Sequence, residues 1–243
     1  MWLCSMRIGI VGGTGAMGKG LALRWCQKHK ISVGSRDLAK ASSRASNYNR
    51  IAKGFYGDRM KERIEGNLNA ETIRTSDVVV VALPAEHMIE IIRETKTQLR
   101  PEQVVVSTVV SMIREERLFK YLPLSSGQST GLSAAELIAK EIEPVQVVSA
   151  FETIPASYLA DLNLALNMDV LISGNDEDAL QIVSDLVRDI PNLRPLRVGP
   201  LANSRLVEPI TPLLLNVAIL NNLREPSIRV VHDHHQISRN GAH

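Results

Sequence analysis

Near its start the chain reads Arg7-Ile8-Gly9-Ile10-Val11-Gly12-Gly13-Thr14-Gly15-Ala16-Met17-Gly18-Lys19-Gly20. The β-branched residues Ile8, Ile10 and Val11 predict a short buried strand, and residues 21–26 predict a helix. The glycines Gly13-x-Gly15-x-x-Gly18 fall between the two, which is the context of a dinucleotide-binding fingerprint. They allow a tight turn, a close backbone approach to a pyrophosphate and close packing of helix on strand. We therefore expect phosphates at the N-terminus of this helix.

The end of the next strand indicates which dinucleotide binds. Residues 31–34 predict a strand that is followed by Ser35 and Arg36, with Lys40 one helical turn later. NAD-binding proteins usually carry Asp or Glu near this place, which would repel a 2′-phosphate. Arg can grip a phosphate through two parallel hydrogen bonds. The pattern favours NADP over NAD; the alternative is that Arg36 and Lys40 are solvated surface charges.

Composition excludes several classes of protein. The 243 residues carry a net charge of +2 and 4% aromatic residues, which argues against a nucleic-acid partner. No apolar run is long enough for a membrane span, and residues 1–5 lack the features of a signal peptide, so we expect a cytoplasmic protein with no membrane partner. Cys4 and Cys26 fit a reducing compartment. Met1 and Met6 are both possible starts. His232-Asp233-His234-His235 is expected to be a disordered tail, and no metal site is expected elsewhere.

Apolar runs and helical patterns alternate through the first two thirds of the chain. Further strands are predicted at 77–83, 103–108 and 145–150, and helices at 38–52, 85–95 and 133–142, the last opened by a capping box of Ser133 and Glu136. The segments 53–69 and 122–130 are expected to be mainly loops. Alternating strands and helices predict an α/β fold with a doubly wound parallel sheet, a Rossmann NADP-binding domain over residues 1–153.

The last third is expected to be a smaller α-rich domain, residues 154–243. Strands are predicted at 170–173 and 196–198, and an amphipathic helix at 176–189. A very apolar helix, 213–223, follows Thr211 as N-cap and Pro212 as first helical residue. A helix this apolar must be buried, either on its own domain or on another subunit. Because it is apolar on more than one face, we expect it at the interface of a homodimer.

Several motifs together resemble the archaeal NADP oxidoreductases that use the deazaflavin coenzyme F420. They are Gly12-Gly13-Thr14-Gly15-x-x-Gly18-Lys19-Gly20, Gly34-Ser35-Arg36 with Lys40, Pro84-x-Glu86-His87, Thr153-Ile154-Pro155-Ala156, and Gly199-Pro200-Leu201-x-Asn203-Ser204-Arg205-Leu206-Val207-Glu208. The resemblance runs from about Met6 to about Val231, and the last motif is the most specific. It implies hydride exchange between reduced F420 and NADP.

The resemblance also implies roles for particular residues. The pyrophosphate would be cradled by Thr14, Gly15, Ala16 and Met17, and the 2′-phosphate held by Ser35, Arg36 and Lys40. The ribose and nicotinamide would be lined by Leu83, His87, Val109 and Ala150, with Asn203 and the region 206–214 helping to close the site. No catalytic side chain is expected, because the two cofactors carry the hydride chemistry.

Two departures from the family pattern leave the second substrate open. Glu152 stands where such proteins often carry His, and Ala202 where they often carry Ser. An anionic Glu152 that only accepts hydrogen bonds would not help to bind an anionic deazaflavin. The alternatives are an NADPH-dependent reductase of a flavin or of a small imine or ketone, in which His87 or Glu152 matters as a proton donor, and a non-catalytic NADPH-binding sensor.

Overall fold

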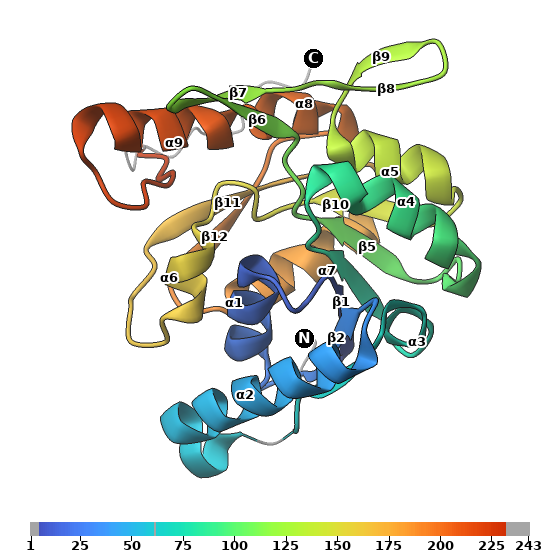
Figure 1. Cartoon of the computed structure of the whole chain (residues 1–243), viewed down its shortest axis with the longest axis vertical. Coiled ribbons are helices and arrows are strands. Elements are labelled where there is room, and N and C mark those ends of the chain that lie inside the picture. The colour runs from blue at the N-terminus through green and yellow to red at the C-terminus, as the bar shows by residue number, and fades with distance from the viewer. Residues whose placement is uncertain (1–4, 61, 232–243) are drawn as a thin grey trace, which may run out of the picture.

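A central sheet of eight strands organises the molecule (Figure 1). The computed structural model describes residues 5–60 and 62–231, so Cys4 and the histidine-rich tail lie outside it. The strands of the sheet are β1 (Arg7–Val11), β2 (Lys30–Ser35), β3 (Glu65–Leu68), β4 (Val78–Val81), β5 (Val104–Ser107), β10 (Gln146–Ser149), β11 (Met168–Gly174) and β12 (Leu193–Arg197). Their order across the sheet is β12-β11-β10-β5-β4-β1-β2-β3.

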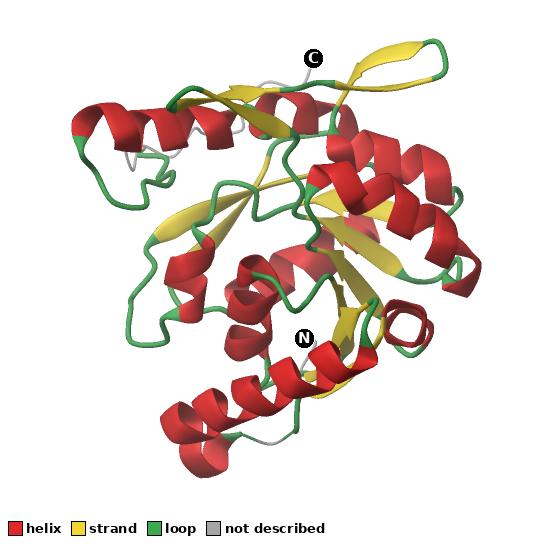
Figure 2. Cartoon of the chain, viewed as in Figure 1, coloured by secondary structure: helices red, strands yellow, loops and turns green. Residues whose placement is uncertain are grey.

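The six strands from β10 to β3 are parallel, and β11 runs antiparallel to β10. Figure 2 shows helices on both faces of the sheet. The helices are α1 (Ala16–Trp25), α2 (Leu38–Tyr56), α3 (Asn69–Arg74), α4 (Ala85–Thr95), α5 (Ala134–Ile142), α6 (Ala156–Ala160), α7 (Glu177–Arg188), α8 (Ser204–Val207) and α9 (Ile210–Asn221), with 3₁₀ turns at Gly57–Arg59, Lys96–Gln98 and Leu201–Asn203. The predicted doubly wound α/β architecture is confirmed.

Each face of the sheet carries its own hydrophobic core. In β4, Val78 and Val80 belong to the core under α1, α2 and α7, whereas Val79 and Val81 belong to the core under α4 and α5. Side chains alternate between faces along a strand, so a run of valines is buried on both. The unbroken β-branched runs that predict strands are therefore central strands of the sheet.

Two segments predicted as loops contain strands. The segment 53–69 ends in β3, which has a polar sequence and pairs with β2 at the edge of the sheet. The segment 122–130 enters a hairpin of β8 (Leu124–Ser126) and β9 (Ser129–Leu132), and another hairpin precedes it, β6 (Met112–Glu115) with β7 (Leu118–Tyr121). These strands are short and mostly exposed or half-buried, so they lack the run of buried apolar residues from which a strand is predicted.

The predicted start of the last helix is wrong. Helix α9 begins at Ile210, and the Thr211 hydroxyl donates a hydrogen bond to the carbonyl oxygen of Glu152 instead of capping the helix. Pro212 lies within the first turn, where the missing N–H costs nothing. By contrast, the capping box of Ser133 and Glu136 at α5 is confirmed.

The chain after residue 153 continues the same sheet through β11 and β12. Arg24 on α1 adds a buried link, because its guanidinium donates to the carbonyl oxygens of Tyr158, Leu159, Asp161 and Leu164. The predicted boundary falls just after β10, and the division into two domains stays a prediction. Among the described residues, no helix is long and apolar enough to cross a membrane.

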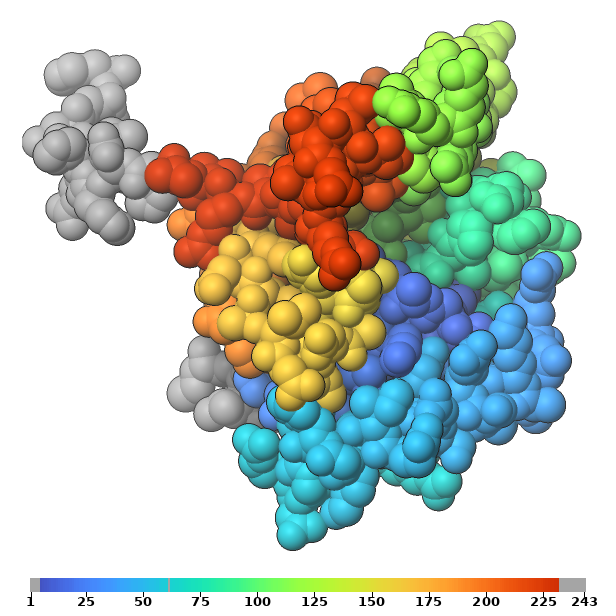
Figure 3. All heavy atoms as spheres, turned by 60° about the vertical axis from the view of Figure 1, so that its left-hand side comes forward, coloured from blue at the N-terminus to red at the C-terminus, as the bar shows by residue number. Residues whose placement is uncertain are grey.

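Helix α9 is not buried within its own chain, contrary to one of the two expected placements. Only Pro212 in it is fully buried, while Leu213 and Leu220 are 60% and 57% exposed. Its contact with the rest of the molecule runs along β7, where the Asn216 amide accepts from the N–H and donates to the carbonyl of Phe119. In the space-filling view α9, in red, lies at the surface (Figure 3).

Candidate functional site

The turn between β1 and α1 is shaped by its glycines. Gly12 has a φ of +75°, and a Cβ there would stand 2.6 Å from the Ala82 carbonyl oxygen. A Cβ on Gly18 would lie 2.4 Å from the Gly13 Cα, so the helix packs directly on the turn. The left-handed residue of the tight turn is thus Gly12, one position before the fingerprint's first glycine.

Gly15 is free of such crowding. The nearest atom to a Cβ on Gly15 would be the Gly12 carbonyl oxygen at 3.4 Å. Gly15 is also the N-cap of α1, and no side chain caps this end of the helix or places an acid in its first turn. The first amides of α1, beginning with Ala16 and Met17, are therefore available to an anion.

The end of β2 presents positive charge beside this turn. Arg36 and Lys40 are exposed, and Ser35 is buried with its hydroxyl accepting from the Asp37 N–H at 3.2 Å. Asp37 is the N-cap of α2, because its carboxylate accepts from the Lys40 N–H at 3.1 Å. The Asp37 carboxylate is thereby turned to the N-terminus of α2, where negative charge is favoured.

The turn after β1 and the residues after β2 line a common cleft of about 270 Å³. It is lined by Gly12, Thr14, Gly15, Ser35, Arg36, Lys40, Asn69, Ala82, Leu83, Pro84, His87 and Ile91. The cleft lies at the carboxyl ends of β1, β2 and β4, where ligands bind in open parallel sheets. The structure thus brings together Thr14, Gly15, Ser35, Arg36, Lys40, Leu83 and His87 from the predicted set.

Other predicted residues lie elsewhere. Val109 and Ala150 are buried after the neighbouring strands β5 and β10, and the Ala150 N–H donates to the Ser107 carbonyl oxygen. Asn203 does not line the cleft, and its side-chain amide donates to the Val198 carbonyl oxygen. Sequence reasoning also missed Asn69, which no motif surrounds.

The run from Asn203 to Glu208, which carries the last motif of the resemblance, docks on the N-terminus of α5. The Ser204 and Ser133 hydroxyls lie 2.6 Å apart, and Arg205 pairs with Glu136. Glu208 is fully buried and accepts from the N–H groups of Ala134 and Ala135 at 3.0 and 3.2 Å. In this structure the run therefore serves to fasten α8 to α5.

Two carboxyl groups near the contact of α8 with α5, those of Glu152 and Glu208, are buried. Burial raises the pKa of Glu208 to about 7, against the opposing effect of its two backbone donors. Burial also raises the pKa of Glu152 to about 8, with a smaller contribution from the Glu208 charge and an opposing hydrogen bond from Ser149. Glu152 therefore holds its proton at neutral pH. The expectation that Glu152 is anionic is wrong, because this carboxyl is desolvated.

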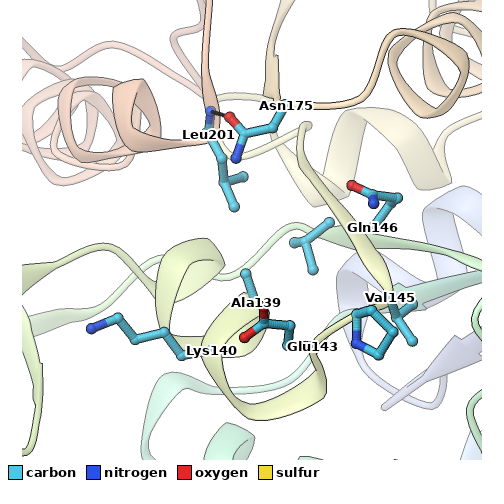
Figure 4. Close-up of a pocket in the computed structure, with 9 residues that line it drawn as sticks. Ala139, Lys140, Glu143, Val145, Gln146, Asn175 and Leu201 are labelled. Carbon is cyan, nitrogen blue, oxygen red and sulfur yellow. Dashed lines mark hydrogen bonds between the residues drawn. The ribbon is translucent and has the colours of Figure 1, made fainter.

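A second cavity, of about 400 Å³, opens at the amino end of β10 (Figure 4). Its wall includes Lys140 and Glu143 from the end of α5 and Gln146 from β10. Asn175 accepts from the Leu201 N–H at 3.0 Å on the opposite side. This cavity holds none of the predicted site residues. Within the described residues, no group of three or more His, Cys, Asp or Glu is arranged for a metal ion.

Comparison with known proteins gives consistent matches. A family model described as NADP oxidoreductase coenzyme F420-dependent matches residues 7–111. The chain is 34% identical over 228 residues to an F420-dependent NADP reductase of Methanocaldococcus jannaschii, covering 93% of this chain and 98% of that protein. It is 33% identical over 229 residues to the F420-dependent NADP reductase of Methanothermobacter thermautotrophicus, covering 93% and 94%.

A solved structure agrees in fold. A putative F420-dependent NADP reductase from Arthrobacter sp. FB24 superposes with a TM-score of 0.75 at 19% identity, covering 94% of this chain and all of that one. A reductive aminase of Aspergillus terreus, solved with NADPH, superposes with a TM-score of 0.56 at 14% identity, covering 90% of this chain and 63% of that one. At 19% and 14% identity, these structural similarities show a shared fold and nothing more.

Proposed function

Because the chain belongs to the family of F420-dependent NADP reductases, we propose that it transfers a hydride between reduced coenzyme F420 and NADP. The observation that carries the proposal is the cleft itself. It joins an uncapped helix N-terminus to the exposed cations Arg36 and Lys40 at the carboxyl edge of a parallel sheet. Such a cleft suits a dinucleotide that ends in a 2′-phosphate.

The residues of the cleft fit NADP. Thr14, Gly15 and the first amides of α1 would hold the pyrophosphate, since the space beside Gly15 is open on the cleft side. Arg36 and Lys40 would pair with the 2′-phosphate, assisted by the Ser35 hydroxyl. The bound nicotinamide supplies the carbon that gives or takes the hydride.

The remaining predicted residues act at the nicotinamide end. Val109 and Ala150 are buried after β5 and β10 and would form a dry wall there. Leu83 and His87, which line the cleft, would flank the ribose, and Asn203 with residues 206–214 would help to close the site. The protein's task is to align the two reacting carbons and to exclude water.

The buried carboxyl of Glu152 is compatible with the deazaflavin as second substrate. A neutral Glu152 places no negative charge against an anionic substrate, so the departure from the family pattern does not oppose its binding. The group also does not line the cleft, which gives it no contact as proton donor to an imine or ketone bound there.

The decisive experiment offers the purified chain NADP with reduced F420, with reduced flavin, and NADPH with a panel of imines and ketones. We expect NADP reduction with reduced F420 at a rate at least tenfold above either alternative, read from the visible band of oxidised F420. Faster turnover with an imine or a flavin would replace the proposal with that reaction. NADPH binding without turnover of any substrate would favour a sensor.

The exposed apolar face of α9 supports a homodimer. Leu213, Leu220 and Leu223 are all more than half exposed. Exposed apolar surface of this extent marks an interface, and a two-fold dimer is the commonest way to cover it. Light scattering should give about twice the chain mass of 26.8 kDa. A monomer at micromolar concentration would contradict the dimer.

A matched pair of variants tests the placement of that interface. Leu220→Glu on α9 should shift the protein to a monomer while leaving its melting temperature nearly unchanged. Leu38→Glu, at a 51% exposed position on α2, is the control and should leave the dimer intact. The predicted cytoplasmic location stays a prediction, which fractionation of cells expressing the chain tests.

A further inference from the structure

Asp37 lies in the sequence between the two cations of the cleft. Arg36 precedes it and Lys40 follows it by three residues, and both of these line the cleft, whereas Asp37 does not. Within the part of the chain that the structure describes, the ion pairs involve neither Arg36 nor Lys40. The acid between the two cations therefore leaves their charges free for a ligand.

Three hydrogen bonds of Asp37 fix the backbone on both sides of it. Its N–H donates to the Ser35 hydroxyl at 3.2 Å, and its carboxylate accepts from the Lys40 N–H at 3.1 Å. Its carbonyl oxygen accepts from the Ala41 N–H at 3.0 Å. Arg36 thus lies between two residues that are tied to each other, and Lys40 is tied at its own amide. The backbone positions from which both cations extend depend on Asp37.

The next residue of α2, Ala41, is held independently of this cap. Ala41 is fully buried, and a Cβ on Gly66 would stand 2.4 Å from its carbonyl carbon and oxygen, so β3 lies directly against this turn. Loss of the cap would therefore loosen residues 37–40 and leave the rest of α2 packed on the sheet. A change at Asp37 should act on the cleft without unfolding the domain.

The position of this acid also bears on the choice of nucleotide. NAD-binding proteins usually carry an acid near the end of the second strand, where it accepts from the ribose 2′-hydroxyl. In this chain Arg36 follows β2 directly, and the acid comes one residue later. Its carboxylate caps the helix that carries Lys40.

We propose that Asp37 is a positioning residue that sets the preference for NADP over NAD by holding Arg36 and Lys40 in place for the 2′-phosphate. Cations on a loosened turn would have to be ordered when the phosphate binds, and this ordering costs affinity. NAD has no 2′-phosphate, so its binding does not depend on the order of this turn.

The experiment compares Asp37→Ala with Asp37→Asn by calorimetric titration of the full chain with NADP and with NAD. Both variants remove the negative charge, but only asparagine keeps an N-cap acceptor of similar strength. Asp37→Ala should bind NADP at least fivefold more weakly than Asp37→Asn, and the two should bind NAD within twofold of each other. Asp37→Asn should bind NADP at least as tightly as the wild type, because it keeps the cap and removes a negative charge near the phosphate.

Asp176 offers a matched control. It is the N-cap of α7, where its carboxylate accepts from the Ala179 N–H at 2.8 Å, and it lies outside the cleft lining. Asp176→Ala should lower the melting temperature about as much as Asp37→Ala, because each variant removes one helix cap. Unlike Asp37→Ala, it should leave the binding of both nucleotides unchanged.

The proposal rests on the NADP binding of the proposed function, and the two fail differently. A wild type that does not bind NADP would overturn both. Equal NADP affinities of Asp37→Ala and Asp37→Asn, in a protein whose wild type binds NADP, would overturn the role of Asp37 alone. If Asp37→Ala loses NADP and NAD affinity equally relative to Asp37→Asn, the cap supports the whole cleft, and the role in nucleotide preference is wrong as well.

Discussion

The β1–β2 corner and the α8–α9 region differ in what their motifs do. The glycine motif of the first is found in many nucleotide-binding proteins, yet its residues line the cleft directly. The run from Asn203 to Glu208 is the most specific motif of the family resemblance, yet its side chains bind the N-terminus of α5 and the loop at Val198. A motif that is typical of one family therefore need not line the ligand cleft. One motif lines the cleft, and the other fastens α8 to α5.

The largest expected effect separates binding from folding at Gly15. Gly15→Val should weaken NADP binding at least 100-fold, because the side chain fills the phosphate space, while the melting temperature changes little. Gly54→Val is the control for an uncrowded glycine outside the cleft, since a Cβ on Gly54 meets nothing within 4 Å. Calorimetry and thermal melts measure both. If Gly15→Val unfolds, or still binds NADP normally, the β1–β2 corner does not act through binding as the comparison requires.

The reverse pattern is expected at Glu208. Glu208→Ala leaves the buried N–H groups of Ala134 and Ala135 unpaired, which should lower the free energy of unfolding by about 3 kcal/mol. Glu208→Gln keeps an acceptor and should lose less. Denaturant titration measures the stability. Loss of NADP affinity in Glu208→Ala under conditions where the variant is fully folded would contradict a purely structural role for this carboxyl group.

Arg36→Ala should weaken NADP binding roughly 10- to 100-fold and leave NAD binding unchanged, because a charged hydrogen bond to the 2′-phosphate is worth about 1.5–3 kcal/mol. Arg44→Ala, at an exposed position on α2 outside the cleft lining, is the control and should change neither. Titration with both nucleotides measures the effect. Equal losses for NADP and NAD would move the 2′-phosphate away from this corner.

The buried carboxyls predict a pH dependence of stability. The folded pKa values of Glu152 and Glu208, about 8 and about 7, lie above the ordinary 4.5. The stability that follows from holding these protons is fully present below about pH 4.5, and it is lost as pH rises through the folded pKa values. The free energy of unfolding should therefore fall by several kcal/mol as the pH rises from 5 to 8.

Glu152→Gln isolates one of the two carboxyls. It should flatten the fall in stability, since glutamine stays neutral throughout, and leave only the part that comes from Glu208. Chemical denaturation at several pH values measures the slope. An unchanged slope in Glu152→Gln would show that this group titrates as in the unfolded chain.

What the sequence predicts well is local. The strand-turn-helix at Gly12 to Gly20, the valine runs and the capping box at Ser133 each depend on neighbours in the chain, and each is confirmed. What it misses depends on distant partners. Strand β3 forms because it pairs with β2 and packs against α2, where Gly66 lies against the Ala41 backbone. Its sequence has no apolar pattern from which a strand could be predicted.

The candidate site divides in the same way. Thr14, Gly15, Ser35, Arg36 and Lys40 follow from strand ends and charge, and they do line one cleft. Asn69 enters the cleft only through the pairing of β3 with β2, so its part could not be predicted from its neighbours in the chain.

The two ends of the C-terminal arm, residues 209–227, are fastened to consecutive peptide groups. Thr211 donates to the carbonyl of Glu152, and the Ser227 hydroxyl donates to the carbonyl of Thr153. Val230 is held farther on by Asp169 and Arg194. A protease that cuts the exposed turn at 222–225 would therefore sever the chain without releasing either piece. Gel electrophoresis under denaturing conditions would show two fragments, and size exclusion would still show one assembled protein.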